Sequence, residues 1–273
     1  MILQSAREGV ARLAIRMDEH TGLAGQFARA FGNDRFAAVE PREVMLYMIE
    51  HHDSGWRDFD QAPLTDPASG LPYNLVDTPA EQITRTSTAS PDFNERHHPY
   101  AGLLSSMHSW GLYNGRYGMS SMVLINTIPA QSRHLADRML AGELARQARL
   151  KSQLATDPQT APWIEPTHLM QNYKQLQFFD TLALYFNRSP HGARSEARFE
   201  HVPLSATEDC TVTVTPIGPD CYRIDPYPFA GTRLECSFTG QRLEPQPDAD
   251  PQHWSERLQA QPAELQHFTL VAI

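Results

Sequence analysis

The sequence predicts a mainly α protein, a helical bundle with a β-hairpin at its N-terminus and a β-rich segment at its C-terminus. Two observations lead to this fold class. Apolar residues recur at helical spacing in several segments before about residue 195, and apolar and polar residues alternate at both ends of the chain. We therefore expect a helical domain with its hairpin at residues 1–195, and a β-rich segment packed on it at residues 196–273.

The first 32 residues contain the hairpin and one helix. Apolar residues alternate on either side of Arg7-Glu8-Gly9, a pattern typical of two short strands joined by a turn. Residues 18–32 carry an apolar stripe at positions i, i+4 and i+8, and Gly32 is the type of residue that ends a helix. We expect a hairpin over residues 1–17 and a helix over residues 18–32.

Further helices follow, interrupted by one long loop. Each of these segments keeps apolar residues on one face. The loop at residues 57–78 is dense in Pro, Gly and Asp, and loops of this length are often functional. Its aromatic residues favour an ordered cover over the site. The helices are expected at residues 41–53, 79–87, 99–113, 130–154 and 165–187.

The last quarter of the chain has the pattern of strands. Short alternating segments are separated by Gly and Pro. The N-terminal hairpin has the right pattern to pair with these strands in one sheet. The expected strands include residues 211–214, 222–224, 234–239 and 268–273.

Composition excludes several classes of protein. The 273 residues are 41% hydrophobic, as in folded globular proteins, and the longest apolar runs are too short to span a bilayer. A net charge of −9 argues against long nucleic acids as partners. The N-terminus lacks the pattern of a signal peptide, and three cysteines without CxxC spacing do not indicate disulfides. We expect a cytoplasmic protein that does not bind membranes.

Polar residues interrupt the apolar stripes of four predicted helices. His52 lies in the middle of an apolar face and is followed by Asp53, while His20, His108 and Asp180 each occupy a stripe position. An imidazole and a carboxylate directed inward each offer a lone pair to a metal ion. A buried carboxylate costs several kcal/mol unless a cation, an arginine or a hydrogen-bond network compensates it. Four such cases predict a metal site.

The ordinary alternative explains each residue separately. A lone histidine on an apolar face is often a core residue that bonds a carbonyl group, and Asp53 is well placed to cap the next turn. On this interpretation the protein is a helical bundle with polar core residues.

The sequence also resembles known families. The order His20, His52-Asp53, His108, Asp180, each on its own helix, resembles the HD superfamily of metal-dependent phosphohydrolases. More closely, the runs HHDSGW, SMHSWGLY and FFDTLALYF resemble the uncharacterised bacterial domain of unknown function 3891 family, over nearly the whole chain. The resemblance implies an HD-like helical bundle.

The HD resemblance also implies roles for these residues. His20, His52, Asp53 and Asp180 would bind a first divalent ion, and Asp53 would be able to bridge to a second. His108, with His97 or His98, would serve the second ion or the phosphate. We therefore expect one or two ions per chain, which could be Mn, Fe, Mg, Ni or Zn. The candidate catalytic residues are Asp53 and His108, His108 is also a candidate metal ligand, and the candidate substrate-binding residues are His51, Arg96, His97 and His98.

The expected function is hydrolysis of a small phosphate ester or a nucleotide. A divalent ion lowers the pKa of a bound water and polarises the phosphoryl oxygen. The partner would then be a small phosphorylated molecule. Two other functions stay open: an HD-type di-iron oxygenase, because imidazole and carboxylate ligands suit iron equally well, and a non-catalytic protein that binds a metal or another ligand.

Overall fold

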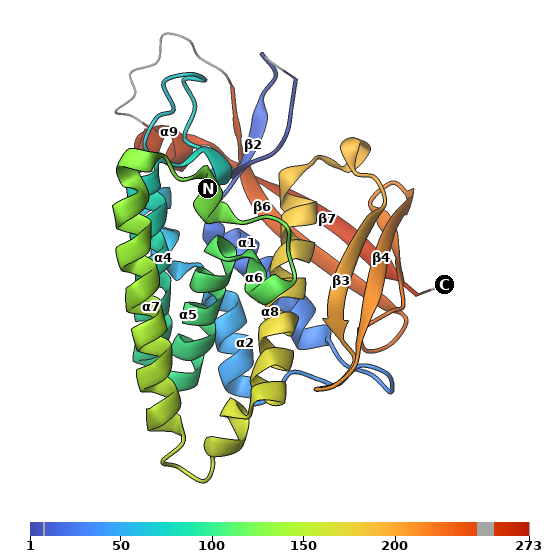
Figure 1. The fold of residues 1–273 in the computed structure, drawn as a ribbon. Coiled ribbons are helices and arrows are strands. Elements are labelled where there is room, and N and C mark those ends of the chain that lie inside the picture. Colours follow the sequence, from blue (N-terminus) through green and yellow to red (C-terminus); the bar gives the residue numbers. More distant parts are fainter. Residues whose placement is uncertain (8, 245–253, 273) are drawn as a thin grey trace.

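The fold is a layer of helices packed against one curled sheet of seven strands (Figure 1). The computed structural model describes residues 1–7, 9–244 and 254–272. Helices account for about 53% of the protein and strands for 20%. The prediction of a mainly α, HD-like helical bundle is therefore wrong, because strands from both ends of the chain form a sheet that is a layer of its own. The fold is mixed α/β.

The predicted helices are all present, and the structure adds short helices at residues 57–61, 115–118 and 254–260. The helix predicted at residues 79–87 continues through the buried Pro91 to His97, and the predicted loop 57–78 begins with a short helix. Packing of α4 on its neighbours overrides the low helix propensity of its Ser, Thr and Pro residues. Within the described part of the chain, no helix is both long and apolar enough to cross a membrane. The helices are α1 (Met17–Ala30), α2 (Arg42–His51), α3 (Arg57–Gln61), α4 (Ala80–His97), α5 (Pro99–Tyr113), α6 (Gly115–Gly118), α7 (Arg133–Leu154), α8 (Pro166–Arg188) and α9 (Trp254–Ala260).

The sheet joins the two ends of the chain. Its strands are β1 (Ile2–Leu3), β2 (Arg12–Ile15), β3 (Ala197–Pro203), β4 (Asp209–Gly218), β5 (Cys221–Asp225), β6 (Arg233–Leu243) and β7 (Ala263–Val271). Their order is β1-β2-β6-β7-β5-β4-β3, with only the β5–β7 pair parallel. The predicted pairing of the hairpin with the C-terminal strands is confirmed by the β2–β6 ladder. Glu8 of the predicted turn and Ile273 of the last predicted strand lie outside the described residues.

Helix α1 takes over the edge of β6 where the hairpin ends. β2 pairs only with residues 241–243 of β6. Farther along this edge, the Gln26 amide accepts a hydrogen bond from Ser237 N (3.1 Å) and donates one to Ser237 O (2.7 Å). Glu19 accepts a hydrogen bond from Thr239 N at 2.7 Å. Backbone groups that would otherwise be unpaired are thereby satisfied, and α1 is fixed beside the sheet.

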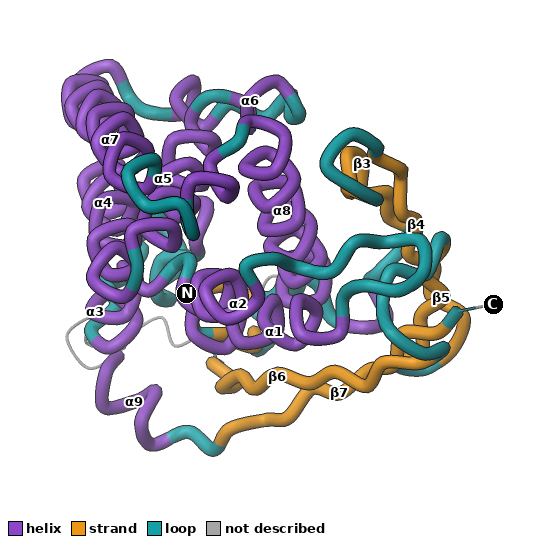
Figure 2. The backbone as a smooth tube through the Cα atoms, turned by 90° about the horizontal axis from the view of Figure 1, so that it is seen from below, coloured by secondary structure: helices purple, strands orange, loops and turns teal. Residues whose placement is uncertain are grey.

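Aromatic side chains fill the space between the sheet and the two helices nearest to it. Figure 2 shows β6 and β7 running beneath α1 and α2, while β5, β4 and β3 curve up beside α8. Phe27 of α1, Phe186 of α8 and Phe268 of β7 are fully or almost fully buried, and the rings of Phe186 and Phe268 are stacked 3.8 Å apart. Each such side chain stabilises the fold by about 1.5–3 kcal/mol. The core thus fixes α1 and α8, which carry His20 and Asp180.

Candidate metal centre

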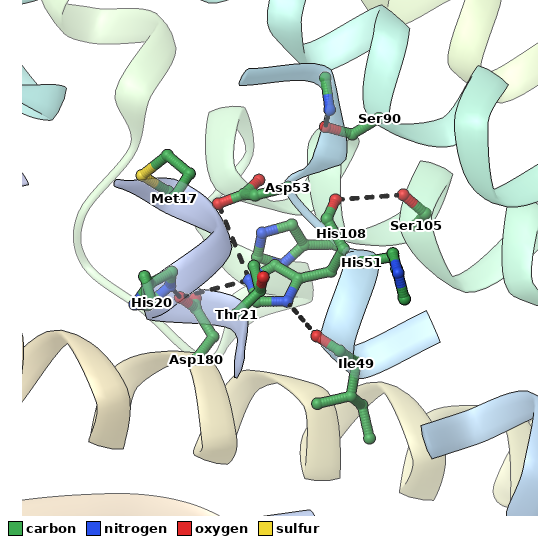
Figure 3. Close-up of polar contacts among 12 residues, drawn as sticks. Met17, His20, Thr21, Ile49, His51, Asp53, Ser90, Ser105, His108 and Asp180 are labelled. Carbon is green, nitrogen blue, oxygen red and sulfur yellow. Dashed lines mark hydrogen bonds and ion pairs between the residues drawn. The ribbon is translucent and has the colours of Figure 1, made fainter. Parts of the chain in front are cut away.

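Four elements bring the five predicted metal ligands to one place (Figure 3). His20 lies on α1, His108 on α5 and Asp180 on α8, whereas His52 and Asp53 directly follow α2. All are buried except Asp53, whose side chain is 16% exposed. Their donor atoms form two groups that share His52, namely His20–His52–Asp180 and His52–Asp53–His108, and within each group the atoms lie within 4.8 Å of one another.

His20 has oxygen atoms facing both of its ring nitrogens. Nδ1 lies 2.9 Å from the Asn187 amide oxygen, and Nε2 lies 3.2 Å from Asp180 Oδ1. A neutral imidazole has one N–H, so it can donate to only one of these oxygens. If Nδ1–H donates to Asn187, the Nε2 lone pair faces a carboxylate oxygen, and a metal ion between the two atoms would stabilise this arrangement. Asn187 was not predicted, although it continues the Asp180 stripe seven residues later.

His52 also has one ring nitrogen that is hydrogen-bonded and one that faces carboxylates. Its Nδ1–H donates to the Ile49 carbonyl at 2.7 Å, which leaves the lone pair on Nε2. Nε2 is buried and has no hydrogen-bond partner among the described residues. It lies 3.7 Å from Asp53 Oδ2 and 3.8 Å from Asp180 Oδ1. Metal-binding histidines typically donate their second N–H to a carbonyl or carboxylate in this way.

The electrostatics of the cluster favour a positive charge beside His52. Burial alone would lower the pKa of His52, but Asp53 and Asp180 raise it from 6.5 to about 9. Burial opposes ionisation of Asp180 as well, yet the His20 and His52 rings beside it hold its pKa well below 3.8. The raised pKa of His52 favours a proton on its ring at neutral pH when no other cation is bound. A divalent cation would supply the same positive charge, and the histidine nitrogens and carboxylate oxygens of the cluster are suitable ligands for it.

His108 differs from the other two histidines. The Gln177 amide donates a hydrogen bond to its Nδ1 at 2.9 Å, so the proton of a neutral ring resides on Nε2. Burial lowers the pKa of His108 to about 4, which keeps the ring neutral at pH 7. His108 thus presents an N–H group to the site, whereas the Nε2 atom of His52 can bind a proton or a metal ion.

Arg116 is a site residue that the sequence analysis missed. Its Nη2 lies 3.5 Å from Asp180 Oδ2, and its side chain is 19% exposed. The side chain projects from a turn in which Arg116 and Tyr117 have left-handed backbones, with φ of 51° and 58°. Such residues cost ~1–2 kcal/mol each and are concentrated at functional sites. The flanking Gly115 and Gly118 are a sequence signal for the turn, but they do not indicate where the arginine points.

Hydrogen bonds from α4 fix the backbone that carries His52 and Asp53. Asn94 donates to the His51 carbonyl at 2.8 Å, and Ser90 Oγ accepts from Gly55 N at 3.0 Å. Gly55 has no room for a side chain, because an added Cβ would lie 2.4 Å from the Thr86 carbonyl oxygen. The glycine of the HHDSGW run therefore allows this segment to pack closely on α4.

None of the four predicted substrate-binding residues belongs to the two groups of donor atoms or lines the adjoining cavity. The rings of His51 and His97 both stack on the Tyr47 ring, at centroid distances of 4.2 and 3.4 Å, respectively. Arg96 lies over Phe93, and His98 Nδ1 accepts a hydrogen bond from Tyr100 N at the start of α5. These contacts organise α2, α4 and α5. The positions of the four residues give no support to a contact with substrate.

A cavity of about 360 Å³ opens onto the cluster. Its lining includes His20, Asp53, His108, Asp180 and Arg116 together with many apolar side chains. The predicted cover contributes residues 74–76, and Trp56, which precedes it, packs edge-on against Phe59. Residues of the segment 57–78 therefore border the cavity, as the sequence predicted.

Fold and site together define a mixed α/β protein with a buried histidine–aspartate cluster at the base of a cavity. The chain belongs to the family described as Protein of unknown function (DUF3891), whose model matches residues 1–245. The resemblance to this family is thereby confirmed. Neither a curated protein nor a solved structure matched the chain.

Proposed function

We propose that this protein is a metal-dependent phosphohydrolase of the HD superfamily type, acting on a small phosphate ester or a nucleotide. The observation that carries the proposal is the His52 imidazole. Its Nε2 atom is buried between two carboxylates, without a hydrogen-bond partner in the described chain, and its Nδ1–H donates to the Ile49 carbonyl. A divalent ion beside Nε2 accounts for this arrangement and for the neighbouring His20.

The proposed site takes one ion per chain. His20, His52, Asp53 and Asp180 would hold it, in agreement with the nitrogen and oxygen ligands that Mn, Fe, Ni and Zn accept. Both groups of donor atoms depend on His52, and His52 has a single free nitrogen. Arg116 already supplies a positive charge on the other side of Asp180, at Oδ2. These two features favour one ion over two.

The other residues of the site would act on the ester itself. A divalent ion supplies Lewis-acid polarisation of a phosphoryl oxygen and lowers the pKa of a water molecule. The Arg116 guanidinium is suited to the remaining phosphoryl oxygens, because it pairs well with tetrahedral oxyanions. Asp53, partly exposed in the cavity, would accept the proton of the attacking water. His108 would donate its Nε2–H to a phosphoryl or leaving-group oxygen.

The reaction then balances as a simple hydrolysis. The water oxygen forms a bond to phosphorus while the bond from phosphorus to the ester oxygen breaks. The ester oxygen leaves as an alcohol after taking up a proton, and one water molecule is consumed. Asp53 and His108 would therefore both be catalytic residues, and His108 would act as a hydrogen-bond donor and not as a metal ligand.

One observation favours a second candidate function. Much of the cavity wall is apolar, including Trp56, Leu112 and Leu184. An oxygenase that oxidises C–H bonds requires an apolar substrate next to its metal, and the same ligand set accepts iron. The Arg116 charge at the floor of the cavity favours the phosphate ester over this alternative.

The decisive experiment combines metal analysis with a hydrolysis screen. We expect about one Mn, Fe, Ni or Zn ion per chain, hydrolysis of a phosphate ester, loss of both with chelator, and recovery on adding the ion. His52→Gln should abolish both, whereas His134→Gln, at an exposed position on α7, should change neither. Iron-loaded protein that consumes oxygen and ignores phosphate esters would establish the oxygenase instead. Protein that binds no metal would refute the proposal.

A further inference from the structure

The cavity above the metal cluster has an apolar second layer. Leu112 lies one helical turn after His108 on α5, and Leu184 lies one turn after Asp180 on α8. Residues four apart on a helix share one face, and both leucines line the same cavity as the residues that precede them. The polar floor is therefore followed directly by aliphatic side chains. A wholly polar substrate would lie against a wall that offers it few hydrogen bonds.

The apolar wall continues to the mouth of the cavity. Trp56, Leu75 and Ile83 extend it on the side of the predicted cover and α4. At the rim, Val76 is 61% exposed and Met122 is 71% exposed. Single exposed hydrophobic residues are common, but these two line one cavity and come from separate segments of the chain. Both would be covered by a ligand that reaches from the floor to the rim.

Charged side chains line the cavity at the floor and also beyond the apolar layer, where the exposed Arg188 follows Leu184 by one turn of α8. Arg116 lies beside Asp180 at the floor, where an anionic group next to the cluster would meet it. The cavity of about 360 Å³ is within the usual size of small-molecule sites, which are mostly apolar with a few fixed polar groups. Asn74, Ser87, Ser109 and Thr127 are uncharged polar members of the lining, and most of the remaining side chains are aliphatic or aromatic.

We propose that the ligand of this cavity is an organic phosphate monoester with an apolar alkyl or aryl body. Its phosphate lies at the floor against Arg116, and its body lies along Leu112, Leu184 and Trp56 toward Val76 and Met122. This substrate class rests on the proposed function for its phosphate group, while the apolar body follows from the wall alone.

Alkylphosphonates test this inference, because their carbon–phosphorus bond resists hydrolysis. We would measure binding of methyl-, propyl- and hexylphosphonate and of inorganic phosphate to the full chain loaded with manganese. Affinity should rise by about fourfold for each added methylene that becomes buried, and phenylphosphonate should bind more tightly than inorganic phosphate. A series of equal affinities would overturn the inference. Alkyl carboxylates that bind more tightly than the matching phosphonates would overturn the choice of phosphate.

Variants at the rim locate the body without disturbing the core. Hexylphosphonate should bind more tightly than methylphosphonate, and we call the ratio of the two affinities the gain. Val76→Gln and Met122→Gln, both at exposed positions, should each reduce this gain by several-fold. Leu144→Gln, at a 49% exposed position on α7, should leave this gain unchanged. An unchanged gain in both rim variants would show that the body does not reach the rim and would overturn its proposed placement.

The same measurements separate this inference from the proposed function. Metal-dependent hydrolysis of small polar esters together with a flat phosphonate series would keep the function and refute the apolar substrate. A steep phosphonate series in protein that neither binds metal nor hydrolyses any ester would keep the apolar ligand and refute the function.

Discussion

The Nε2 atom of His52 and the Oδ1 atom of Asp180 lie 3.8 Å apart in a buried position, too far for a hydrogen bond. His20 Nε2 lies 3.2 Å from the same oxygen. Bonds from nitrogen and oxygen ligands to divalent transition metals are ~2.0–2.2 Å long. Ligand atoms that share one such ion lie roughly 3–4 Å apart, so these separations suit ligands of one cation.

Replacing Asp180 should remove the metal. Asp180→Asn deletes a charged ligand and leaves the His52 and His20 rings without their shared carboxylate. We expect the metal content to fall from about one ion per chain to near zero, and the unfolding temperature to become insensitive to added metal. Asp137→Asn is the control, since this carboxylate is exposed on α7 and pairs only with Arg133 among the described contacts. Full metal occupancy in the Asp180 variant would show that this carboxylate is structural.

The metal-free protein should lose stability as the pH rises from 6.5 to 9. His52 has a pKa of about 9 in the folded state and about 6.5 when unfolded, so its contribution is complete below pH 6.5 and disappears as pH passes 9. The difference corresponds to about 3 kcal/mol of unfolding free energy. At the acid end, the depressed pKa of Asp180 adds stability above pH 3.8 that is lost as the pH falls.

Urea unfolding at several pH values checks this behaviour. With bound metal the loss above pH 6.5 should disappear, because the cation takes the place of the proton on Nε2. His52→Gln should remove the corresponding pH dependence from the metal-free protein. A wild-type protein whose metal-free stability is constant over this range would contradict the assigned charge on His52.

Gly55→Ala should destabilise the protein and weaken the site. The new Cβ would lie 2.4 Å from the Thr86 carbonyl oxygen and 2.6 Å from Ser90 N, both backbone atoms of α4. Overpacking of this kind costs ~1–3 kcal/mol, and the resulting shift would displace the neighbouring Asp53. Denaturant unfolding and metal titration measure the two effects.

Gly142→Ala provides the matched control for this substitution. Gly142 lies within α7, and an added Cβ meets no atom of the described chain within 4 Å. Alanine there should raise stability by about 1 kcal/mol, because it favours the helix more than glycine. Equal effects at both glycines would show that the close approach at Gly55 is unimportant.

Arg116→Gly should lower activity without lowering stability. Hydrogen bonds to charged groups contribute ~1.5–3 kcal/mol, so kcat/KM for a phosphate ester should fall by roughly 10- to 100-fold. Glycine adopts a φ of 51° without steric cost, which offsets the loss of the contact to Asp180. Asp220→Gly is the control, since Asp220 also has a φ of 51° but lies in the turn between β4 and β5. Unchanged kcat/KM in the arginine variant would remove Arg116 from substrate binding.

The buried positions of the candidate ligands could be predicted from the sequence because they interrupt the apolar stripes of helices. A histidine or aspartate within an apolar stripe points inward whatever the tertiary structure, and Asp180 and His20 are cases of this kind. The supporting residues were harder to find. Asn187 and Gln177 are polar residues on α8 that acquire meaning only when the rings of His20 and His108 approach them. The position of the Arg116 side chain depends on a left-handed turn, which cannot be predicted from a pattern of apolar residues.

The prediction of the fold class was wrong for a related reason. Most strands were recognised from alternation, although β3 was not, and the predicted pairing of the hairpin with the C-terminal strands did not show that the sheet forms a layer of its own. Five strands from the last quarter of the chain and two from its first residues combine into one sheet through long-range ladders. The helix through Pro91 likewise depends on packing against α5 and the 3₁₀ turn at Ser54–Trp56, which local propensity does not contain.

The side-chain bonds from α1 to β6 make the sheet a reporter of events at the cluster. Gln26 and Glu19 hold the amides of Ser237 and Thr239, and His20 follows Glu19 on the same helix. Opening of this part of β6 requires α1 to detach, and detachment would carry His20 away from Asp180. Amide hydrogen exchange at Ser237 and Thr239 should therefore slow when metal binds, although neither residue is near the ion. The strands that follow α8 are in this sense part of the same cooperative unit as the ligands.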